Sequence, residues 1–157
     1  MPALTLDCIG VDTLDGEIQR LAVSLGLQDA VRFHGYVPWD ELAPWYHGAT
    51  CHLVTSRHEA GPVAFVEAAA CGVPTVGTRV GHVADLAAVV PPAAVAVDIG
   101  DADALAREIV AMCTRPDHRR AIGEAAHAWA AVHDADATAA AFVERWAQLV
   151  AARSRRS

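Results

Sequence analysis

Short apolar segments alternate with segments of helical periodicity along the first hundred residues, and this alternation restricts the chain to few folds. Strands are expected over residues 4–9, 31–34, 51–55, 75–78 and 95–97. Parallel strands need a crossover connection between them, and that connection is usually a helix. The order therefore predicts an α/β fold with a parallel sheet flanked by helices.

The connecting segments have the apolar spacing of amphipathic helices. In residues 17–25, Ile18, Leu21 and Leu25 fall on one face of a helix of period 3.6, and Gly26 is placed to end it. Further helices are expected over residues 39–47, 62–71, 101–113, 116–131 and 137–152. From Asp101 onward no strand pattern remains, so the C-terminal segment is expected to be wholly helical.

Composition and charge exclude several classes of protein. Hydrophobic residues make up 54% of the 157 residues and charged residues 20%, which is unlike a disordered chain. No apolar run approaches the ~20 residues of a transmembrane helix. The net charge of -7 is unsuited to nucleic acid. We expect a cytoplasmic, bacterial protein with one domain over residues 1–152 and a disordered basic tail over 153–157.

The cysteines and histidines do not have the spacing of metal ligands. Cys8, Cys51, Cys71 and Cys113 each lie in an apolar stretch and form no C-x-x-C pair. The histidines show no H-E-x-x-H or comparable pattern. We therefore expect free cysteines in a reducing compartment and no bound metal.

Familiar nucleotide and hydrolase motifs are also missing. The segment after the first expected strand, residues 10–16, lacks the G-x-G-x-x-G spacing of a dinucleotide site. All twelve Lys and Arg residues are Arg, so a P-loop lysine is absent. No G-x-S-x-G turn is present, which excludes Ser56 and His58 as a hydrolase pair.

Residues 55–78 have the pattern of a strand, a loop and a helix that begins at Gly61 and Pro62. A helix start presents free backbone N–H groups and a positive dipole end, which together attract anions. In an open parallel sheet, ligands bind at this end of the strands. Glu59 and Glu67 can face the same cleft, and a carboxylate can accept both hydrogen bonds of a vicinal diol. An anion site beside two carboxylates indicates a nucleotide-sugar site.

The same segment resembles a known family. The spacing E-x7-E of Glu59 and Glu67 and the run E-A-A-A-C-G-V-P-T-V over residues 67–76 resemble the signature of retaining GT-B glycosyltransferases of family 4, group 1. Residues 31–37, V-R-F-H-G-Y-V, and residues 78–85, T-R-V-G-H-V-A-D, resemble further motifs of that family, the latter its loop T-x-x-G-G-x-x-E. The similarity runs along nearly the whole chain, in order.

This resemblance implies that the chain is a donor-binding, Rossmann-like domain, with a parallel sheet flanked by helices, and forms the C-terminal half of a GT-B enzyme. By family analogy, Glu67 holds the ribose hydroxyls and Glu59, the catalytic candidate, holds the hydroxyls of the donor sugar. The remaining binding residues would contact the diphosphate, line the site or border the base; they are Ser56, Arg57, Gly61, Pro62, Val63, Ala64, His82, Gly35, Tyr36 and Val37. No cofactor or metal is implied, since the nucleoside diphosphate sugar is the donor substrate.

The sequence departs from the family pattern in three respects. Pro62 supplies no N–H where the family often has Gly, and His82 replaces a Gly; His82 could donate to a sugar phosphate or be a solvated loop residue. We expect the N-terminal acceptor domain to be absent. This chain alone is then expected to be inactive. Its expected partner is that acceptor domain, in cis or in trans. Through the acceptor domain the protein could also lie at the inner face of the membrane.

The sequence is compatible with two other functions. The chain could be a truncated module that binds a nucleotide sugar, or a partner chain, without transfer. It could also be a structural α/β domain that has lost its ligand.

Tyr36 and Trp45 are interpreted as core or boundary aromatics, and the apolar stripe of Phe142, Trp146 and Leu149 as core packing. Where that stripe is exposed, it would favour homo-oligomers through the C-terminal helix.

Overall fold

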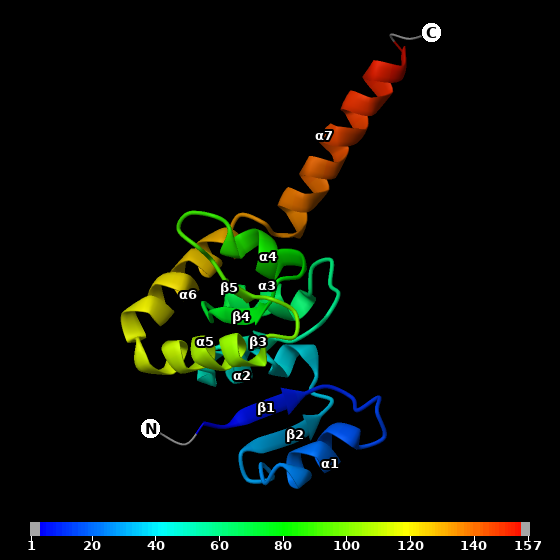
Figure 1. Cartoon of the computed structure of the whole chain (residues 1–157). Helices are drawn as coiled ribbons and strands as arrows, with labels where there is room; N and C mark the ends of the chain where they lie inside the picture. The colour runs from blue at the N-terminus through cyan, green and yellow to red at the C-terminus, as the bar shows by residue number, and fades with distance from the viewer. Residues whose placement is uncertain (1–3, 155–157) are drawn as a thin grey trace. The chain divides into compact units, whose positions relative to one another are not determined.

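A computed structural model describes residues 4–154 (Figure 1). Within this range the chain forms two compact units, residues 4–44 and 45–154. The boundary between Pro44 and Trp45 falls inside the short helix α2 (Ala43–Gly48). The domain limits predicted from the sequence, 1–152, stay a prediction.

The first unit is built on two parallel strands, β1 (Leu6–Ile9) and β2 (Val31–Gly35), joined by helix α1 (Glu17–Ser24). Before α1, the Asp12 carboxylate accepts hydrogen bonds from the amides of Leu14 at 2.9 Å and Gly16 at 2.6 Å. These two bonds lower the pKa of Asp12 below its ordinary value. The short 3-10 helix η1 (Trp39–Glu41) follows β2.

The second unit contains a parallel sheet in the order β3 (His52–Val54), β4 (Thr75–Thr78) and β5 (Val95–Val97). Helix α3 (Val63–Ala70) connects β3 to β4, and helix α4 (Gly81–Ala87) connects β4 to β5. Every residue of the central strand β4 is buried. The α/β class with parallel sheets flanked by helices, predicted from the alternating pattern, is confirmed.

Strand register separates the side chains of this sheet into two faces. Leu53, Val76 and Val95 are aligned across the three strands and pack with Met112 and Ile122. The next row, which includes Val54, faces the other way because side chains alternate along a strand. A second buried cluster covers that face: Val54, Phe65, Ala69, Val80, Val83, Leu86, Ala93, Ala94 and Ala126. Both faces of the sheet are therefore covered, as in doubly wound folds.

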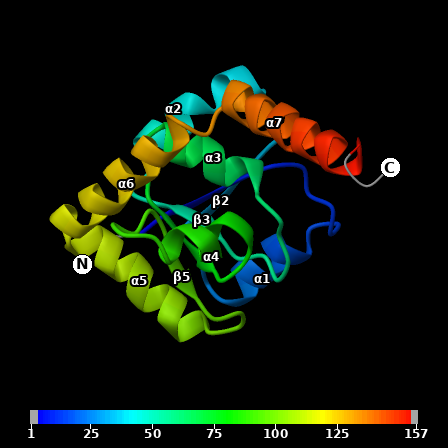
Figure 2. The same cartoon turned by 90° about the horizontal axis from the view of Figure 1, so that it is seen from above.

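Three helices follow the sheet: α5 (Ala102–Thr114), α6 (Pro116–Ala130) and α7 (Ala135–Ser154) (Figure 2). The Asp101 carboxylate caps α5 by accepting a hydrogen bond of 2.8 Å from the amide of Ala104. Pro116 occupies the first turn of α6, where its missing N–H costs no helical bond. Residues 155–157 of the predicted tail lie outside the described residues.

Helix α7 does not bury its apolar stripe. Figure 1 shows it as one uninterrupted helix, coloured orange to red, and Phe142 and Trp146 are 73% and 69% exposed. The interpretation of this stripe as core packing is wrong for the described chain. Its exposure meets the condition under which we expect self-association, and the self-association itself stays a prediction.

Several predicted boundaries are correct, and two local predictions need correction. Strands at residues 75–78 and 95–97 are confirmed. The helix expected over residues 39–47 is instead split into η1 and α2, with Pro44 in the first turn of α2. A proline fits the start of a helix and interrupts its interior, so the helix restarts there. The segment treated as a loop at residues 81–85 is part of helix α4.

The four cysteines are free and partly buried, as expected. Cys51 packs against the apolar cluster of Val76, Met112 and Ile122, and burial raises the pKa of its thiol to about 11. No helix in residues 4–154 has the length and apolarity needed to cross a bilayer.

The packing of α6 predicts an unusual response to Gly123→Ala. In a helix interior, alanine normally gives a more stable helix than glycine does. At this position, however, a β-carbon would overlap the carbonyl oxygen of Gly72. We expect Gly123→Ala to lower the free energy of unfolding by about 1–3 kcal/mol in urea titrations. Gly48→Ala, where no atom lies within 4 Å of the added carbon, is the control and should be neutral or stabilising.

Candidate functional site

The loop after β3 is held by the end of β4. The Thr78 hydroxyl donates to the carbonyl oxygen of Ser56 at 2.5 Å, with a longer approach of 3.4 Å to that of Val54. Gly81, at φ +44°, lies so close to the loop that a β-carbon would overlap the carbonyl oxygen of Ala60. Only glycine fits this backbone contact, so the position of the loop depends on Gly81.

The first turn of α3 carries backbone N–H groups with no acceptor. Pro62 is the extended residue before the helix, and its carbonyl oxygen accepts from the amide of Phe65 at 3.0 Å. Within residues 4–154, no protein group accepts a hydrogen bond from the amides of Gly61, Val63 or Ala64. Unsatisfied amides at a helix start favour an anion. The missing N–H of Pro62 does not disturb the helix.

Glu59 is oriented by a neighbouring hydroxyl. The Ser56 side chain donates to Glu59 Oε1 at 2.8 Å, and both residues are partly buried. Arg57, between them, is exposed and is the guanidinium nearest to this loop in sequence. One carboxylate of the predicted pair is therefore fixed by the same loop that leads into α3.

Glu67 is oriented from a different element. The Tyr46 hydroxyl, on α2, donates to Glu67 Oε2 at 2.8 Å in a partly buried environment. Burial and the adjacent Glu67 carboxylate raise the pKa of Tyr46 above its ordinary value. The phenol is therefore a stable donor, and Glu67 is held in one orientation.

His52 supports the Tyr46 ring. The two rings lie edge to face with centroids 6.1 Å apart, and His52 Nδ1 lies 3.1 Å from the Thr75 hydroxyl. Burial lowers the pKa of His52, and the negative charge of Glu67 only partly opposes this effect. A neutral imidazole thus links β4 to the tyrosine that contacts Glu67.

His82 lies beside the start of α3. A β-carbon built on Gly61 would be 2.6 Å from His82 Nε2, so the imidazole packs directly against this glycine. The ring is also 5.4 Å from Trp129 and 6.0 Å from Phe65, measured between centroids. The aromatic neighbours fix His82 next to the free amides, which differs from a solvated loop position.

The other predicted residues, Gly35, Tyr36 and Val37, belong to the first unit. Gly35 ends β2 at φ +67°, a conformation that favours glycine. Tyr36 is 72% exposed, so its interpretation as a core aromatic is wrong, whereas Trp45, at 37%, is a boundary residue.

Tyr46 and His52 were not identified from the sequence, because neither lies in a motif that suggests contact with Glu67.

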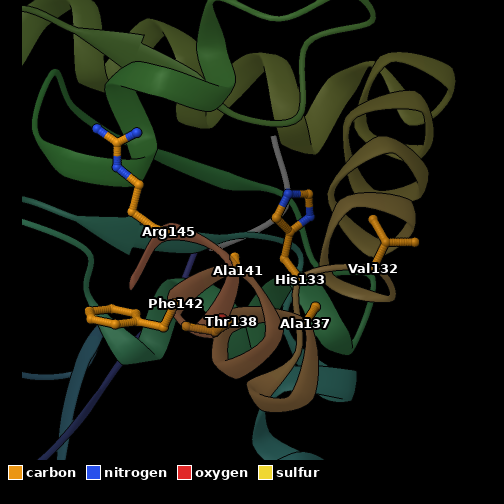
Figure 3. Close-up of a pocket in the computed structure, with 7 residues that line it drawn as sticks. All are labelled: Val132, His133, Ala137, Thr138, Ala141, Phe142 and Arg145. Carbon is orange, nitrogen blue, oxygen red and sulfur yellow. The ribbon is translucent and has the colours of Figure 1, made fainter. Parts of the chain in front are cut away.

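A separate hollow of about 510 Å³ lies at the turn between α6 and α7 (Figure 3). Its lining residues are Val132, His133, Ala137, Thr138, Ala141, Phe142 and Arg145. The ring of His133 stacks on Trp129 at 4.7 Å between centroids. None of the residues predicted to bind a ligand lines this hollow.

In the part of the chain described, no group of three or more His, Cys, Asp or Glu side chains is placed to hold a metal ion. The carboxylates of Glu59 and Glu67 instead each pair with a hydroxyl group. The expectation of metal-independent donor binding stays a prediction.

Comparison with known proteins identifies the family. Residues 2–129 match the family described as glycosyl transferases group 1, and the chain belongs to this family. A D-inositol 3-phosphate glycosyltransferase of Streptosporangium roseum is 31% identical over 153 residues, covering 94% of this chain and 35% of the relative. Another, from Frankia alni, is 45% identical over 62 residues, covering 40% and 15%. The chain thus spans about a third or less of these relatives.

Solved structures agree with this assignment. Sucrose-phosphate synthase from Thermosynechococcus elongatus has a TM-score of 0.81 at 27% identity, covering 94% of this chain and 39% of that one. HepE of Anabaena in complex with UDP-glucose has a TM-score of 0.71 at 25% identity, covering 83% and 36%. The resemblance to the C-terminal domain of a group 1, GT-B glycosyltransferase is confirmed.

The lowered pKa of His52 predicts a pH dependence of stability. As the pH falls below about 6.5, His52 takes up a proton in the unfolded chain, whereas the folded chain, with its lower pKa, stays neutral at this residue. Protonation therefore favours the unfolded state. This contribution to stability is present above that pH and is lost as the pH falls through the folded-state pKa. We expect His52→Gln to reduce the difference between unfolding free energies measured in urea at pH 7.5 and pH 5.5.

The control is His47→Gln, an exposed position on α2. It should leave the difference between the two pH values as in the parent chain. An equal effect of both substitutions would contradict the assignment of this pH dependence to the burial of His52.

Proposed function

We propose that this chain is the donor-binding part of a retaining glycosyltransferase, one that transfers a hexosyl group from a nucleoside diphosphate sugar. The observation that carries the proposal is the start of α3, where amides without an acceptor lie in sequence between Glu59, in the preceding loop, and Glu67, in the helix. Each of these carboxylates accepts a hydrogen bond from a hydroxyl group. Anion binding and diol binding are the two requirements of a nucleotide sugar. The family membership supports the same reaction class.

In this proposal, the diphosphate binds the amides of Gly61, Val63 and Ala64. Charge that develops on the leaving diphosphate is stabilised there by oriented backbone dipoles, with His82 beside them as a further donor. Arg57 adds a nearby positive charge. Pro62 contributes shape only, since it has no N–H.

The two carboxylates take the sugars. Glu67 accepts the ribose hydroxyls, and Glu59 accepts hydroxyls of the transferred sugar near the reacting carbon. The contact of Gly35, Tyr36 and Val37 with the base, which the family resemblance implies, stays a prediction. The complex of HepE with UDP-glucose makes a uridine nucleotide the first ligand to test.

Transfer also needs an acceptor site, which we assign to a second domain. The chain spans 35% of the Streptosporangium roseum relative, so the relatives contain a long region without a counterpart here. We propose that an equivalent domain works with this one, in the same polypeptide or as a partner chain.

Nucleotide binding by this chain is testable directly. On titration with UDP, GDP and ADP, we expect amide NMR shifts at residues 61–67 for one of the three. Inorganic pyrophosphate has no ribose. It should therefore shift the amides at the start of the helix and leave those next to Glu67 unshifted. Glu67→Gln should weaken nucleotide binding roughly tenfold or more, since a charged acceptor of two hydroxyls is lost.

Glu124→Gln, an exposed substitution on α6, is the matched control and should leave the titration unchanged. The absence of shifts at residues 61–67 with all three nucleotides at millimolar concentration would contradict the proposed function. Shifts elsewhere on the chain would count against it equally.

The exposed stripe of α7 predicts self-association of the chain when it is alone in solution. Phe142, Trp146 and Leu149 are 73%, 69% and 56% exposed and recur on one side of the helix. We expect sedimentation velocity to show concentration-dependent oligomers that Trp146→Glu removes. Gln148→Glu adds the same charge nearby and should not remove them; an identical effect would exclude the stripe as the cause.

A further inference from the structure

Tyr46 lies outside the sequence segment that forms the proposed site, yet its hydroxyl contacts one of the two carboxylates. The segment begins at Thr55, whereas Tyr46 belongs to α2. Its hydroxyl donates to Glu67 Oε2 at 2.8 Å, and the bond is partly buried. An element before β3 therefore determines where the Glu67 carboxylate points.

The Tyr46 ring is itself fixed by a chain of contacts that ends in the core. It lies edge to face with His52, whose Nδ1 is 3.1 Å from the hydroxyl of Thr75. Thr75 begins the buried central strand β4 and is 1% exposed. The phenol hydroxyl is thus positioned relative to the sheet and not by its own short helix alone.

This bond leaves Glu67 able to bind a diol. An ionised carboxylate has about four lone-pair sites, and Tyr46 occupies one of them on Oε2. The other oxygen and the remaining site can accept two hydroxyl groups. Because the phenol stays protonated, it donates to one lone pair of the carboxylate and leaves the others to accept the hydroxyl groups of a ligand.

A glutamate side chain with three rotatable bonds loses conformational freedom when it binds a ligand. A donor that already holds the carboxylate removes part of that loss before binding occurs. We propose that Tyr46, supported by His52 and Thr75, is a positioning residue that preorganises Glu67 to bind the ribose diol of the donor. This inference rests on the proposed function of Glu67.

The test compares ribonucleotides with analogues that lack the diol. Dissociation constants are measured by calorimetry for UDP, GDP and ADP and for the 2′,3′-dideoxy counterpart of the one that binds. Tyr46→Phe keeps the ring and removes only the hydroxyl. We expect it to weaken ribonucleotide binding by roughly 3- to 10-fold and to leave dideoxynucleotide binding unchanged.

Two further variants separate positioning from a general structural effect. In the Glu67→Gln background, adding Tyr46→Phe should change ribonucleotide affinity by less than twofold, about the error of such a comparison, because the carboxylate it positions is gone. His47→Gln, exposed on the same helix, should leave both affinities unchanged.

Each result has one meaning. If Tyr46→Phe weakens binding of the ribonucleotide and of its dideoxy counterpart equally, or weakens neither, the positioning role is overturned while the proposed function stays intact. If the parent chain binds the ribonucleotide and its dideoxy counterpart with equal affinity, or binds neither, the proposed role of Glu67 is contradicted, and this inference with it. Selective loss of ribonucleotide affinity supports the inference.

Discussion

The close contact between the ends of β3 and β4 is the constraint on which the candidate site depends. Thr78 donates to the carbonyl oxygen of Ser56, and Gly81 lies against the backbone of Ala60. These contacts fix the loop that carries Glu59 and leads into α3. Without them, the free amides of α3 and the Glu59 carboxylate would have no fixed relation to each other.

The two carboxylates share an arrangement although they lie on different elements. Each accepts a hydrogen bond of 2.8 Å from one hydroxyl, Ser56 for Glu59 and Tyr46 for Glu67. A carboxylate held in this way keeps lone pairs for a ligand and loses less freedom on binding. The pairing is what makes this surface suited to sugar hydroxyls, in addition to the anion site at the helix start.

Much of this was predictable from the sequence, because the signals involved are local. Alternating apolar segments identify the strands, and Gly61 and Pro62 mark the start of α3. The spacing of Glu59 and Glu67, together with the surrounding run, identifies the family. Local patterns also explain the wrong interpretation of α7, since an apolar stripe has the same spacing whether a core or an absent partner covers it.

The contacts that position the site were not predictable, because they join residues far apart in sequence. Tyr46 and Glu67 are separated by 21 positions, and His52 and Thr75 by 23. The packing of His82 on Gly61 likewise depends on α3 and α4 starting side by side. Such pairs follow from strand register and crossover geometry, which no short motif encodes.

The most direct measurement is a crystal structure of this chain with the nucleoside diphosphate sugar that it binds. The account predicts diphosphate oxygens about 3 Å from the amides of Val63 and Ala64 and ribose hydroxyls on Glu67. A diphosphate bound away from the start of α3, or a ribose that does not contact Glu67, would contradict it.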